Sequence, residues 1–371
     1  METTFLIVGG GFGGLETAIH LRRLSPQASI TLVTQEPYLV YKPWLVFLPA
    51  QRRSFEQCQI PLAPLAKQFR FRLLVDTVTT LTPSQHQVRL VSGEHISYAH
   101  VLIATGSTAD REVIAGTREN AYSPCDVEDA LSFQKRFLQL QKGTVTVILG
   151  GQRPGPGLEY AGWIARYLRE HRLSDAIHLQ VVDSQPRLMG HLGARAADAL
   201  EAILSKPGVR LLTGQPVTAI TATSVQMRDG QSYASDLTAV IGYLRGQELG
   251  VDPPVVDEKG FVPVNDFFQH PAFPDLFAIG DAATFPRAAP KSMLQARLQA
   301  PLAAQNLGAQ ARGQSGERVS STRLRQGRVI ALPDVGGETA MVLQGGKVMA
   351  GSWPLLLRTL VDHAYFLRRS K

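Results

Sequence analysis

The spacing of apolar residues predicts a strand–helix–strand unit at the start of the chain. A short apolar run from Thr4 to Val8 is typical of a buried parallel strand, and a glycine-rich turn follows it. The segment from Leu15 to Leu24 then has the pattern of a helix, which Ser25-Pro26 ends. A second apolar run, from Ile30 to Val33, completes the unit.

The same order of elements recurs in the middle of the chain. Residues Thr144 to Leu149 predict a strand, glycines follow, a helix is expected from about Leu158 to Glu170, and Ile177 to Val182 predicts the next strand. Two such units in one chain imply two nucleotide-binding domains of the α/β class.

The remaining pattern is shorter and more mixed. A polar segment rich in glycine and serine, from Gly308 to Arg323, has the composition of a linker. The other expected elements are alternating segments, short strands and two helices: Val217 to Met227, Leu237 to Leu244, Leu276 to Ile279, Ser292 to Leu307, Val329 to Leu332, Ala340 to Leu343, and Pro354 to Arg369.

Composition narrows the class of protein. The 371 residues are 44% hydrophobic and 19% charged, which suits a globular chain of two or three domains. The formal charge of +7 favours an anionic partner. No block of lysine and arginine with interleaved aromatic residues occurs, so nucleic acid is not expected as a partner. The two cysteines, Cys58 and Cys125, lie in unrelated contexts and predict neither a disulfide framework nor a metal site.

Neither a leader nor a spanning helix is predicted. The apolar start lacks a basic leader and runs directly into glycines. No stretch reaches the roughly 18 unbroken apolar residues that a spanning helix needs. We therefore expect a protein that is soluble or lies on a membrane surface, in a reducing compartment.

Gly9, Gly11 and Gly14 form a GxGxxG motif between the first predicted strand and helix. This spacing permits a tight turn, lets the backbone approach a pyrophosphate, and points helix N–H groups at the anion. Because the strand and helix around it are both predicted, a purely structural turn is the less favoured reading. The acidic ribose partner is less regular: Thr34 ends the second strand, and Glu36, two residues beyond it, is the candidate.

Two further strand ends carry candidate cofactor contacts. One apolar strand ends in Thr105-Gly106, where small residues let the backbone approach a ligand, although any strand end can look like this. Another ends in Gly280-Asp281, where the carboxylate is placed to accept a hydrogen bond from a ribityl hydroxyl. The helix that begins near Ser292 would direct its positive end at a flavin ring, although Ser292 also suits a simple helix cap. Together these motifs predict an FAD site.

In this order, the motifs resemble the flavoprotein disulfide reductase superfamily with two dinucleotide-binding domains. Within it, the chain looks most like the branch of type II NADH dehydrogenases and sulfide:quinone oxidoreductases. Several short segments look specifically like the latter: Tyr41-Lys42-Pro43-Trp44, Ser123-Pro124-Cys125-Asp126, Gly155-Pro156 with Glu159-Tyr160, Gly190-His191-Leu192-Gly193, and Pro290-Lys291. The resemblance implies a cofactor contact for Lys42 and a catalytic role for Lys291.

The resemblance also argues against sulfide as the substrate. Sulfide:quinone oxidoreductases use two redox cysteines beside the flavin, and the resemblance places these positions at Arg153 and Ala331, which cannot carry a persulfide. Cys125 matches only the family's first cysteine, and a cysteine in a loop before a helix is usually structural.

A nicotinamide donor needs its own phosphate loop, and the second glycine-rich turn is irregular. Gly151, Gly155 and Gly157 lie in it without clean GxGxxG spacing, and two prolines remove amide donors. Asp183 ends the following strand, where a carboxylate would bind ribose hydroxyls and repel the extra phosphate of NADPH. Arg153 could bind a pyrophosphate. NADH is therefore expected in preference to NADPH.

Two more features bear on the acceptor. Glu159 matches the glutamate that type II NADH dehydrogenases place between the nicotinamide and quinone sites, although a glutamate in a first helical turn is also favoured by the helix dipole. In the C-terminal helix, Trp353, Leu357, Leu360, Ala364 and Leu367 share one face, while Arg358, Asp362 and Arg369 share another. Such a stripe usually packs on its own domain or on a homodimer partner, but the resemblance implies docking to an anionic membrane surface, helped by Arg368 and Lys371.

These predictions define a domain plan and a function. The expected fold has an FAD-binding Rossmann-like domain at 1–110 and 236–310, an NAD(P)H-type domain at 111–235, and a C-terminal unit with an amphipathic helix at 311–371. The expected function is transfer of electrons from NADH through FAD to a quinone, in the cytoplasm and peripherally on the inner face of the membrane. The alternatives are a sulfide:quinone oxidoreductase-like enzyme with another donor and a catalytically degenerate flavin-binding sensor or interaction protein.

Overall fold

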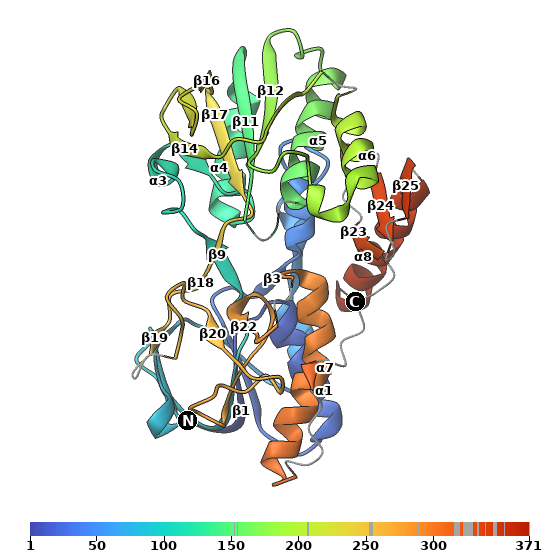
Figure 1. Ribbon diagram of the computed structural model, residues 1–371. Coiled ribbons are helices and arrows are strands. Elements are labelled where there is room, and N and C mark those ends of the chain that lie inside the picture. Colours follow the sequence, from blue (N-terminus) through green and yellow to red (C-terminus); the bar gives the residue numbers. More distant parts are fainter. Residues whose placement is uncertain are drawn as a thin grey trace.

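A computed structural model of the chain describes residues 1–151, 153, 155–205, 208–251, 255–287, 290–314, 320–321, 329–331, 334–337, 339–343, 347–351 and 353–370. Two α/β domains stand one above the other, and a smaller C-terminal unit lies along one side (Figure 1). Much of the predicted linker, together with Leu332 and Lys371, lies outside the described residues.

The first domain is built on an eight-stranded sheet of order β19-β6-β7-β8-β1-β2-β5, in which β21 also pairs with β8. Strand β1 lies between β2 and β8, and both pairs are parallel. The strands of this sheet are β1 (Glu2–Val8), β2 (Ile30–Thr34), β5 (Arg72–Val75), β6 (Val78–Thr82), β7 (Gln87–Leu90), β8 (His95–Ile103), β19 (Gly250–Val251) and β21 (Leu276–Ala278).

The central position of β1 follows from its sequence. Leu6 and Ile7 are fully buried on opposite faces, so the strand is apolar on both sides, as a parallel strand covered by two layers requires. Helices α1 (Phe12–Leu24) and α7 (Met293–Ala311) pack side by side over one face (Figure 1). The predicted first strand and helix are confirmed within β1 and α1, which are slightly longer than expected.

The second domain has a five-stranded parallel sheet of order β10-β17-β11-β12-β13. Its predicted strand–helix–strand unit is confirmed by β11, α5 and β12. The strands are β10 (Ala121–Tyr122), β11 (Gly143–Leu149), β12 (Ile177–Asp183), β13 (Arg210–Thr213) and β17 (Leu237–Ile241), with a separate antiparallel sheet of β14 (Val217–Ile220), β15 (Ser224–Met227) and β16 (Ser232–Ala234). The helices are α3 (Thr117–Asn120), α4 (Val127–Gln139), α5 (Gly155–Glu170) and α6 (Ala194–Ser205).

Strand β17 corrects the predicted domain boundary at residue 236. It pairs with β10 and β11, so the second domain includes Leu237–Ile241 and the chain returns to the first domain only afterwards. A five-residue apolar strand suits a central position in either sheet, which is why the sequence pattern alone misplaced it.

A short antiparallel ribbon joins the two domains. It consists of β9 (Ser107–Ala109) and β18 (Leu244–Gly246), which carry the chain into and out of the second domain (Figure 1). The first domain also contains α2 (Leu62–Gln68) and two small strand pairs, β3 (Tyr38–Val40) with β4 (Gln59–Pro61) and β20 (Val262–Pro263) with β22 (Ala283–Thr284).

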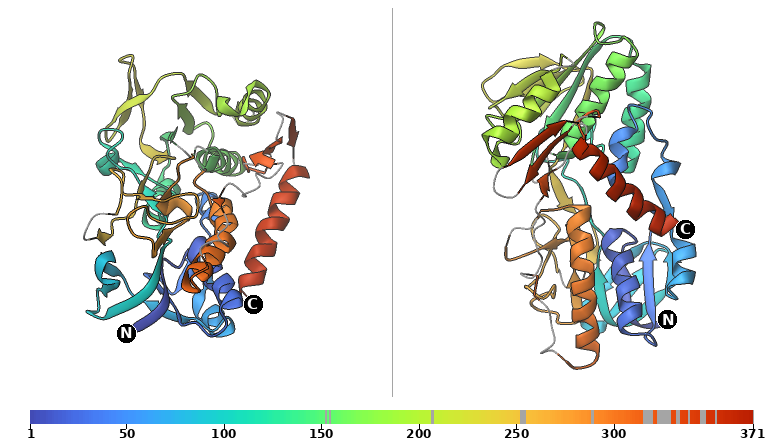
Figure 2. Two further views of the ribbon diagram at one scale, coloured as in Figure 1. Left: turned by 60° about the horizontal axis from the view of Figure 1, so that its bottom comes forward. Right: turned by 90° about the vertical axis from the view of Figure 1, so that its right-hand side faces the viewer.

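The C-terminal unit consists of an antiparallel sheet and a long helix. The sheet contains β23 (Val329–Ala331), β24 (Thr339–Leu343) and β25 (Val348–Gly351), and the helix is α8 (Trp353–Ser370). Figure 2 shows α8 running along the side of the molecule from the second domain to the first. Among the described residues, no helix is both long and apolar enough to cross a membrane.

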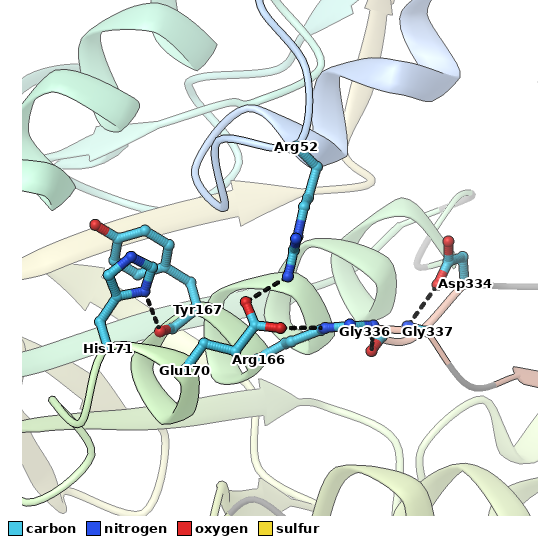
Figure 3. Close-up of polar contacts among 8 residues, drawn as sticks. All are labelled: Arg52, Arg166, Tyr167, Glu170, His171, Asp334, Gly336 and Gly337. Carbon is cyan, nitrogen blue, oxygen red and sulfur yellow. Dashed lines mark hydrogen bonds and ion pairs between the residues drawn. The ribbon is translucent and has the colours of Figure 1, made fainter.

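Polar contacts between the three units meet at one point. Glu170, near the end of α5, forms ion pairs with Arg52 from the first domain and with Arg166 one helical turn earlier (Figure 3). Arg166 also donates a hydrogen bond of 3.2 Å to the carbonyl of Gly336 in the C-terminal unit. One carboxylate therefore links side chains from both domains, and Arg166 extends the contact to the third unit.

Candidate flavin and substrate site

One cavity of about 630 Å³ runs between the two domains and the C-terminal helix. The first glycine loop lines one end of it. Glu159 from the second domain, with Arg358 and Asp362 from α8, lines the other, and Arg153 enters the cavity beside Asp281. The cavity therefore joins three regions that are far apart in the sequence.

The first glycine loop has the shape that a pyrophosphate requires. Gly9 has φ +110°, a conformation that side chains rarely permit. A Cβ at Gly14 would overlap the carbonyl oxygen of Gly9, so α1 approaches the end of β1 as closely as backbone allows. A Cβ at Gly11 would meet no protein atom within 4 Å, and Gly11 lines the cavity. The backbone at Gly11 is thus open to a ligand.

The other predicted contacts of the first domain reach the same cavity. Thr105 and Gly106 follow the end of β8, beside the glycine loop. Glu36 and Lys42 are exposed at its rim. The structure therefore brings together all of the first-domain contacts expected for FAD.

Asp281 lies at the centre of the cavity wall. Gly280, with φ +66°, turns the chain after β21, and its N–H donates a hydrogen bond of 2.6 Å to the side chain of Gln299. One carboxylate oxygen of Asp281 accepts from Ser107 at 3.4 Å and from Arg153 at 3.1 Å. Its other oxygen, Oδ1, is buried without a partner among the described residues. A buried acceptor without a donor fits a ligand hydroxyl, as FAD would supply.

Lys291 stabilises the turn at Gly280 and Asp281 through hydrogen bonds to backbone carbonyl oxygens. Its ammonium donates to the carbonyl oxygens of Asp281 at 2.9 Å and Ala283 at 3.0 Å, and it lies 3.7 Å from the ring centre of Phe261. Burial lowers the pKa of Lys291 to about 8, although Asp281 opposes this. The side chain is not among the residues that line the cavity. The geometry therefore gives Lys291 a positioning role in place of the predicted catalytic contact.

The start of α7 meets the cavity as expected. Ser292 caps the helix by accepting a hydrogen bond of 3.2 Å from the N–H of Gln295. Ser292, Met293 and Ala296 line the cavity. The helix thus presents its N-terminal end, with its partial positive charge, to the cavity.

The second glycine loop is arranged differently. Gly157 has the expected packing role, because a Cβ there would overlap the side chain of Leu149 on β11. Asp183 ends β12 and accepts a hydrogen bond of 2.9 Å from the N–H of Gln185. Of the described residues in this loop, Gly151, Gly155 and Gly157 do not line the cavity, and neither does Asp183. Pro154 lies outside the described residues.

Arg153 extends from this loop into the cavity. Its guanidinium binds Asp281 and lies beside Cys125, and its Nε has no partner among the described residues. Burial opposes the charge of Arg153, but Cys125 and Asp281 more than offset this, so its pKa is raised. Sequence reasoning expected Arg153 to meet a nicotinamide pyrophosphate. In the structure it points at the flavin end of the cavity instead.

Glu159 is the centre of a buried charge cluster at the other end. Both of its oxygens accept hydrogen bonds from Arg358, at 2.6 and 2.8 Å. Arg358 also lies 3.6 Å from Asp362, which accepts a hydrogen bond of 2.8 Å from Tyr41. Burial raises the pKa of Glu159, although Arg358 opposes this. A titratable carboxyl is therefore held where the cavity meets α8.

Helix α8 divides into the two predicted faces, but with the charged face turned inward. Arg358 and Asp362 line the cavity, and Arg369 binds Glu16 at 2.8 Å. The outer face exposes five large apolar side chains: Trp353, Leu356, Leu360, Val361 and Leu367. The side chain of Leu357, predicted on the apolar face, lies outside the described residues. Helical spacing predicted the two faces. No pattern in the sequence indicated that Arg358 and Arg369 would pair with glutamates 199 and 353 positions away in the chain.

Other kinds of site find no support in the described part of the chain. Within it, no group of three or more histidine, cysteine, aspartate or glutamate side chains is placed to hold a metal ion. Cys58 is buried and Cys125 is half-buried, and both are free thiols.

Comparison with known proteins agrees with this geometry. Residues 3–300 match the family model described as pyridine nucleotide-disulphide oxidoreductase. The sulfide-quinone reductase of Aquifex aeolicus is 28% identical over 303 residues, which cover 77% of this chain and 70% of that protein. An NADH dehydrogenase-like protein of Mycobacterium tuberculosis is 24% identical over 296 residues, covering 76% of this chain and 73% of that one.

Solved structures share the fold over nearly the whole chain. The sulfide:quinone oxidoreductase of Aquifex aeolicus superposes with a TM-score of 0.87 at 23% identity, covering 99% of this chain and 91% of that one. NDH2 of Plasmodium falciparum in complex with NADH superposes with a TM-score of 0.77 at 14% identity, covering 100% and 98%. The predicted fold class, with two dinucleotide-binding domains, is thereby confirmed.

Proposed function

Because the chain belongs to the pyridine nucleotide-disulphide oxidoreductase family, whose flavoproteins use FAD, we propose that it is an FAD-dependent enzyme that passes electrons from NADH to a membrane quinone. The observation that carries this proposal is the single cavity that joins the first glycine loop to Glu159 and α8. One end of it has the shape for a dinucleotide, and the other meets the helix whose outer face is apolar.

When bound, FAD would supply the two-electron chemistry that connects the donor with the acceptor. The chain supplies position and charge. Asp281 would hold a ribityl hydroxyl through its free Oδ1, and Lys291 would fix the carbonyl of Asp281. Glu159, paired with Arg358 at rest, would accept a proton beside the acceptor, because burial raises its pKa.

The outer face of α8 supports a place on the membrane surface. An exposed stripe of large apolar residues on a helix in a chain of formal charge +7 suits the interface of an anionic bilayer. Arg368 is exposed near the end of the stripe. We therefore propose that the enzyme lies on the inner, cytoplasmic face of the membrane, where a quinone would reach the cavity from the lipid.

The test uses the outer face of α8 and leaves its inner ion pairs intact. Deleting α8 would leave Glu16 and Glu159 buried and unpaired, which costs about 3–5 kcal/mol for each broken pair. A truncated protein would then lose activity through unfolding, and this loss would look the same as a loss of membrane docking. In FAD-loaded protein, the double variant Leu356→Ser/Leu360→Ser should lose binding to anionic vesicles. It should also lose NADH oxidation by a long-chain quinone in those vesicles, while a water-soluble quinone still reacts.

Val75 and Val91 provide the matched control, because both are exposed apolar residues of the first domain. Val75→Ser/Val91→Ser should leave both activities and vesicle binding unchanged. Equal loss with both quinones in the α8 variant would contradict the docking role. A change of molecular mass on substitution, without any change in vesicle binding, would show that the stripe is a homodimer interface.

A separate observation favours a sulfur compound as a second candidate donor. Cys125, Arg153 and Asp281 line the same cavity, which places a thiol beside a guanidinium near the flavin position. This arrangement would suit a sulfur donor that uses one cysteine. Anaerobic spectra separate the two: we expect NADH to bleach the flavin and sulfide to leave it oxidised. Bleaching by sulfide that Cys125→Ser abolishes would favour the sulfur donor, and reduction by NADH with negligible quinone turnover would favour the sensor.

A further inference from the structure

The second domain has the strand order at which a nucleotide-binding crevice is expected. Strands β12 and β13 follow β11 on one side, and β17 lies on the other, so the strand order reverses between β11 and β17. In open parallel sheets, ligands bind at the carboxyl ends of the strands where the order reverses. Gly150-Gly151 follow β11 and Gly242-Tyr243 follow β17, so these two loops form the walls of the crevice.

The two loops are in close contact. The N–H of Gly150 donates a hydrogen bond of 2.9 Å to the carbonyl of Ile241 at the end of β17. A Cβ added at Gly242 would overlap the carbonyl of Gly150. A Cβ added at Gly150 would overlap the ring of Tyr243 near its hydroxyl end. The tyrosine ring therefore lies on the backbone that a pyrophosphate would have to approach.

The same side chain packs against the apolar cluster that contains Val182, the neighbour in sequence of the predicted ribose partner Asp183. Burial raises the pKa of Tyr243, and the carboxylate of Asp183 adds to this. Asp183 is the residue that would bind ribose hydroxyls. Tyr243 thus lies on the backbone of Gly150 and packs beside the strand that ends in Asp183, near both places where a nicotinamide nucleotide would make contact.

The ring is less constrained than its backbone. The carbonyl of Tyr243 accepts a hydrogen bond of 3.0 Å from the N–H of Asp110, and the strand pairing of β18 with β9 begins at the next residue. The side chain itself is only half-buried. Rotation about the side-chain bonds could move the ring out of the crevice without moving the loop.

We propose that Tyr243 controls access of the nicotinamide nucleotide to the second domain: its ring lies on the backbone of Gly150 and has to swing out for the nucleotide to bind. This inference rests on NADH being the donor. The ring then competes with the pyrophosphate for the same place. If the crevice is open in about one molecule in ten, the measured affinity for the nucleotide is about tenfold weaker than the affinity of the open form.

The experiment measures binding of NAD⁺ to FAD-loaded protein by calorimetry, since NAD⁺ does not reduce the flavin. Tyr243→Ala should lower the dissociation constant about tenfold, because the competing ring is gone. Tyr243→Phe should stay close to the unaltered protein, because it keeps the ring. Tyr233→Ala is the matched control, since Tyr233 packs against the same apolar cluster but lies on β16, and it should bind as the unaltered protein does.

The outcomes separate the two proposals. If the unaltered protein binds NAD⁺ and Tyr243→Ala binds equally or more weakly, the ring is not a gate, while NADH stays a suitable donor. If no variant binds NAD⁺ although each retains FAD, the proposed donor is wrong, and the gate falls with it. Should Tyr243→Ala fail to retain FAD, Tyr243→Leu fills the apolar contact without a ring and decides the question in the same way.

Discussion

The two glycine loops of this chain follow the same local pattern and have different surroundings. Each follows a buried parallel strand and leads into a helix. The first opens on a cavity of about 630 Å³, and a Cβ at Gly11 would meet nothing. In the second, the ring of Tyr243 lies against Gly150. The local motif therefore specifies a turn that could bind a nucleotide, while residues distant in sequence decide whether the site is open.

Arg153 makes the difference between the loops sharper. It belongs to the second loop, yet its guanidinium binds Asp281 of the first domain at 3.1 Å. The charge that could attract a pyrophosphate to the second loop is thus directed to the flavin end of the cavity. A charged side chain of the second domain therefore pairs with a carboxylate of the first domain.

The largest expected effect concerns the packing glycines of the two loops. An added Cβ would meet the rigid carbonyl of Gly9 at Gly14, but the end of the flexible Leu149 side chain at Gly157. We expect Gly14→Ala to destabilise the first domain by about 3 kcal/mol and to lose FAD, and Gly157→Ala to cost about 1 kcal/mol with FAD retained. Flavin absorbance per protein and the midpoint of thermal unfolding measure both. Equal losses in the two variants would show that the loops are equally constrained.

Next in size is the comparison of the two strand-end aspartates. Asp281→Ala removes a charged hydrogen bond worth about 1.5–3 kcal/mol, so the dissociation constant of FAD should rise by about 10- to 150-fold. Asp183→Ala should leave FAD bound and weaken NADH, and Asp183→Arg should shift the preference towards NADPH. Fluorescence titration with FAD and kinetics at saturating NADH and NADPH give the values. Full retention of FAD by Asp281→Ala would contradict its assigned role.

A smaller effect follows from Lys291 and depends on pH. Burial lowers its pKa to about 8 from 10.5, so between these values the unfolded chain binds more protons than the folded one. Stability from this group should therefore rise with pH across that window, by at most about 1.4 kcal/mol per pH unit. Thermal unfolding of FAD-loaded protein over this range should show the rise, and Lys291→Met should reduce it. An unchanged slope in the variant would mean that other groups cause it.

The smallest effect is expected at the exposed contact between the domains. Glu170 pairs with Arg52 and Arg166 on the surface (Figure 3), and exposed pairs contribute about 0.2–1 kcal/mol each. Glu170→Gln should lower the unfolding midpoint only slightly, and added salt should remove the difference. A loss as large as that of Gly14→Ala would show that this contact, and not the buried packing, holds the domains together.

The sequence predicted the fold well because the fold depends on local spacing. The strand–turn–helix pattern around Gly9 and Gly151 needs only glycines and apolar runs, and Asp281 follows a short apolar strand and a glycine. The contacts made by Arg153, Tyr243 and Arg358 could not be predicted in this way. Each pairs with a residue from another element, and the register between elements is fixed only when the domains pack.

The placement of α8 also shows what sequence spacing cannot predict. Helical spacing correctly separated Arg358 and Asp362 from the apolar stripe, but a charged face normally indicates solvent. Here the charged face is buried because Glu159 and Glu16 meet it with opposite charge. Only the three-dimensional partners show which of the two faces points outward.

Helix α8 also fixes the angle between the domains. Arg358 fastens it to α5 of the second domain and Arg369 to α1 of the first, on the side of a molecule whose connecting ribbon is only β9 and β18. A rotation about that ribbon would pull one guanidinium away from its glutamate and leave two buried charges apart, at a cost of about 3–5 kcal/mol. Helix α8 thus resists rotation of the two domains relative to each other, and with it hinge closure around a ligand. Movement during a catalytic cycle must then be small and local, carried by single side chains such as those of Tyr243 and Arg153.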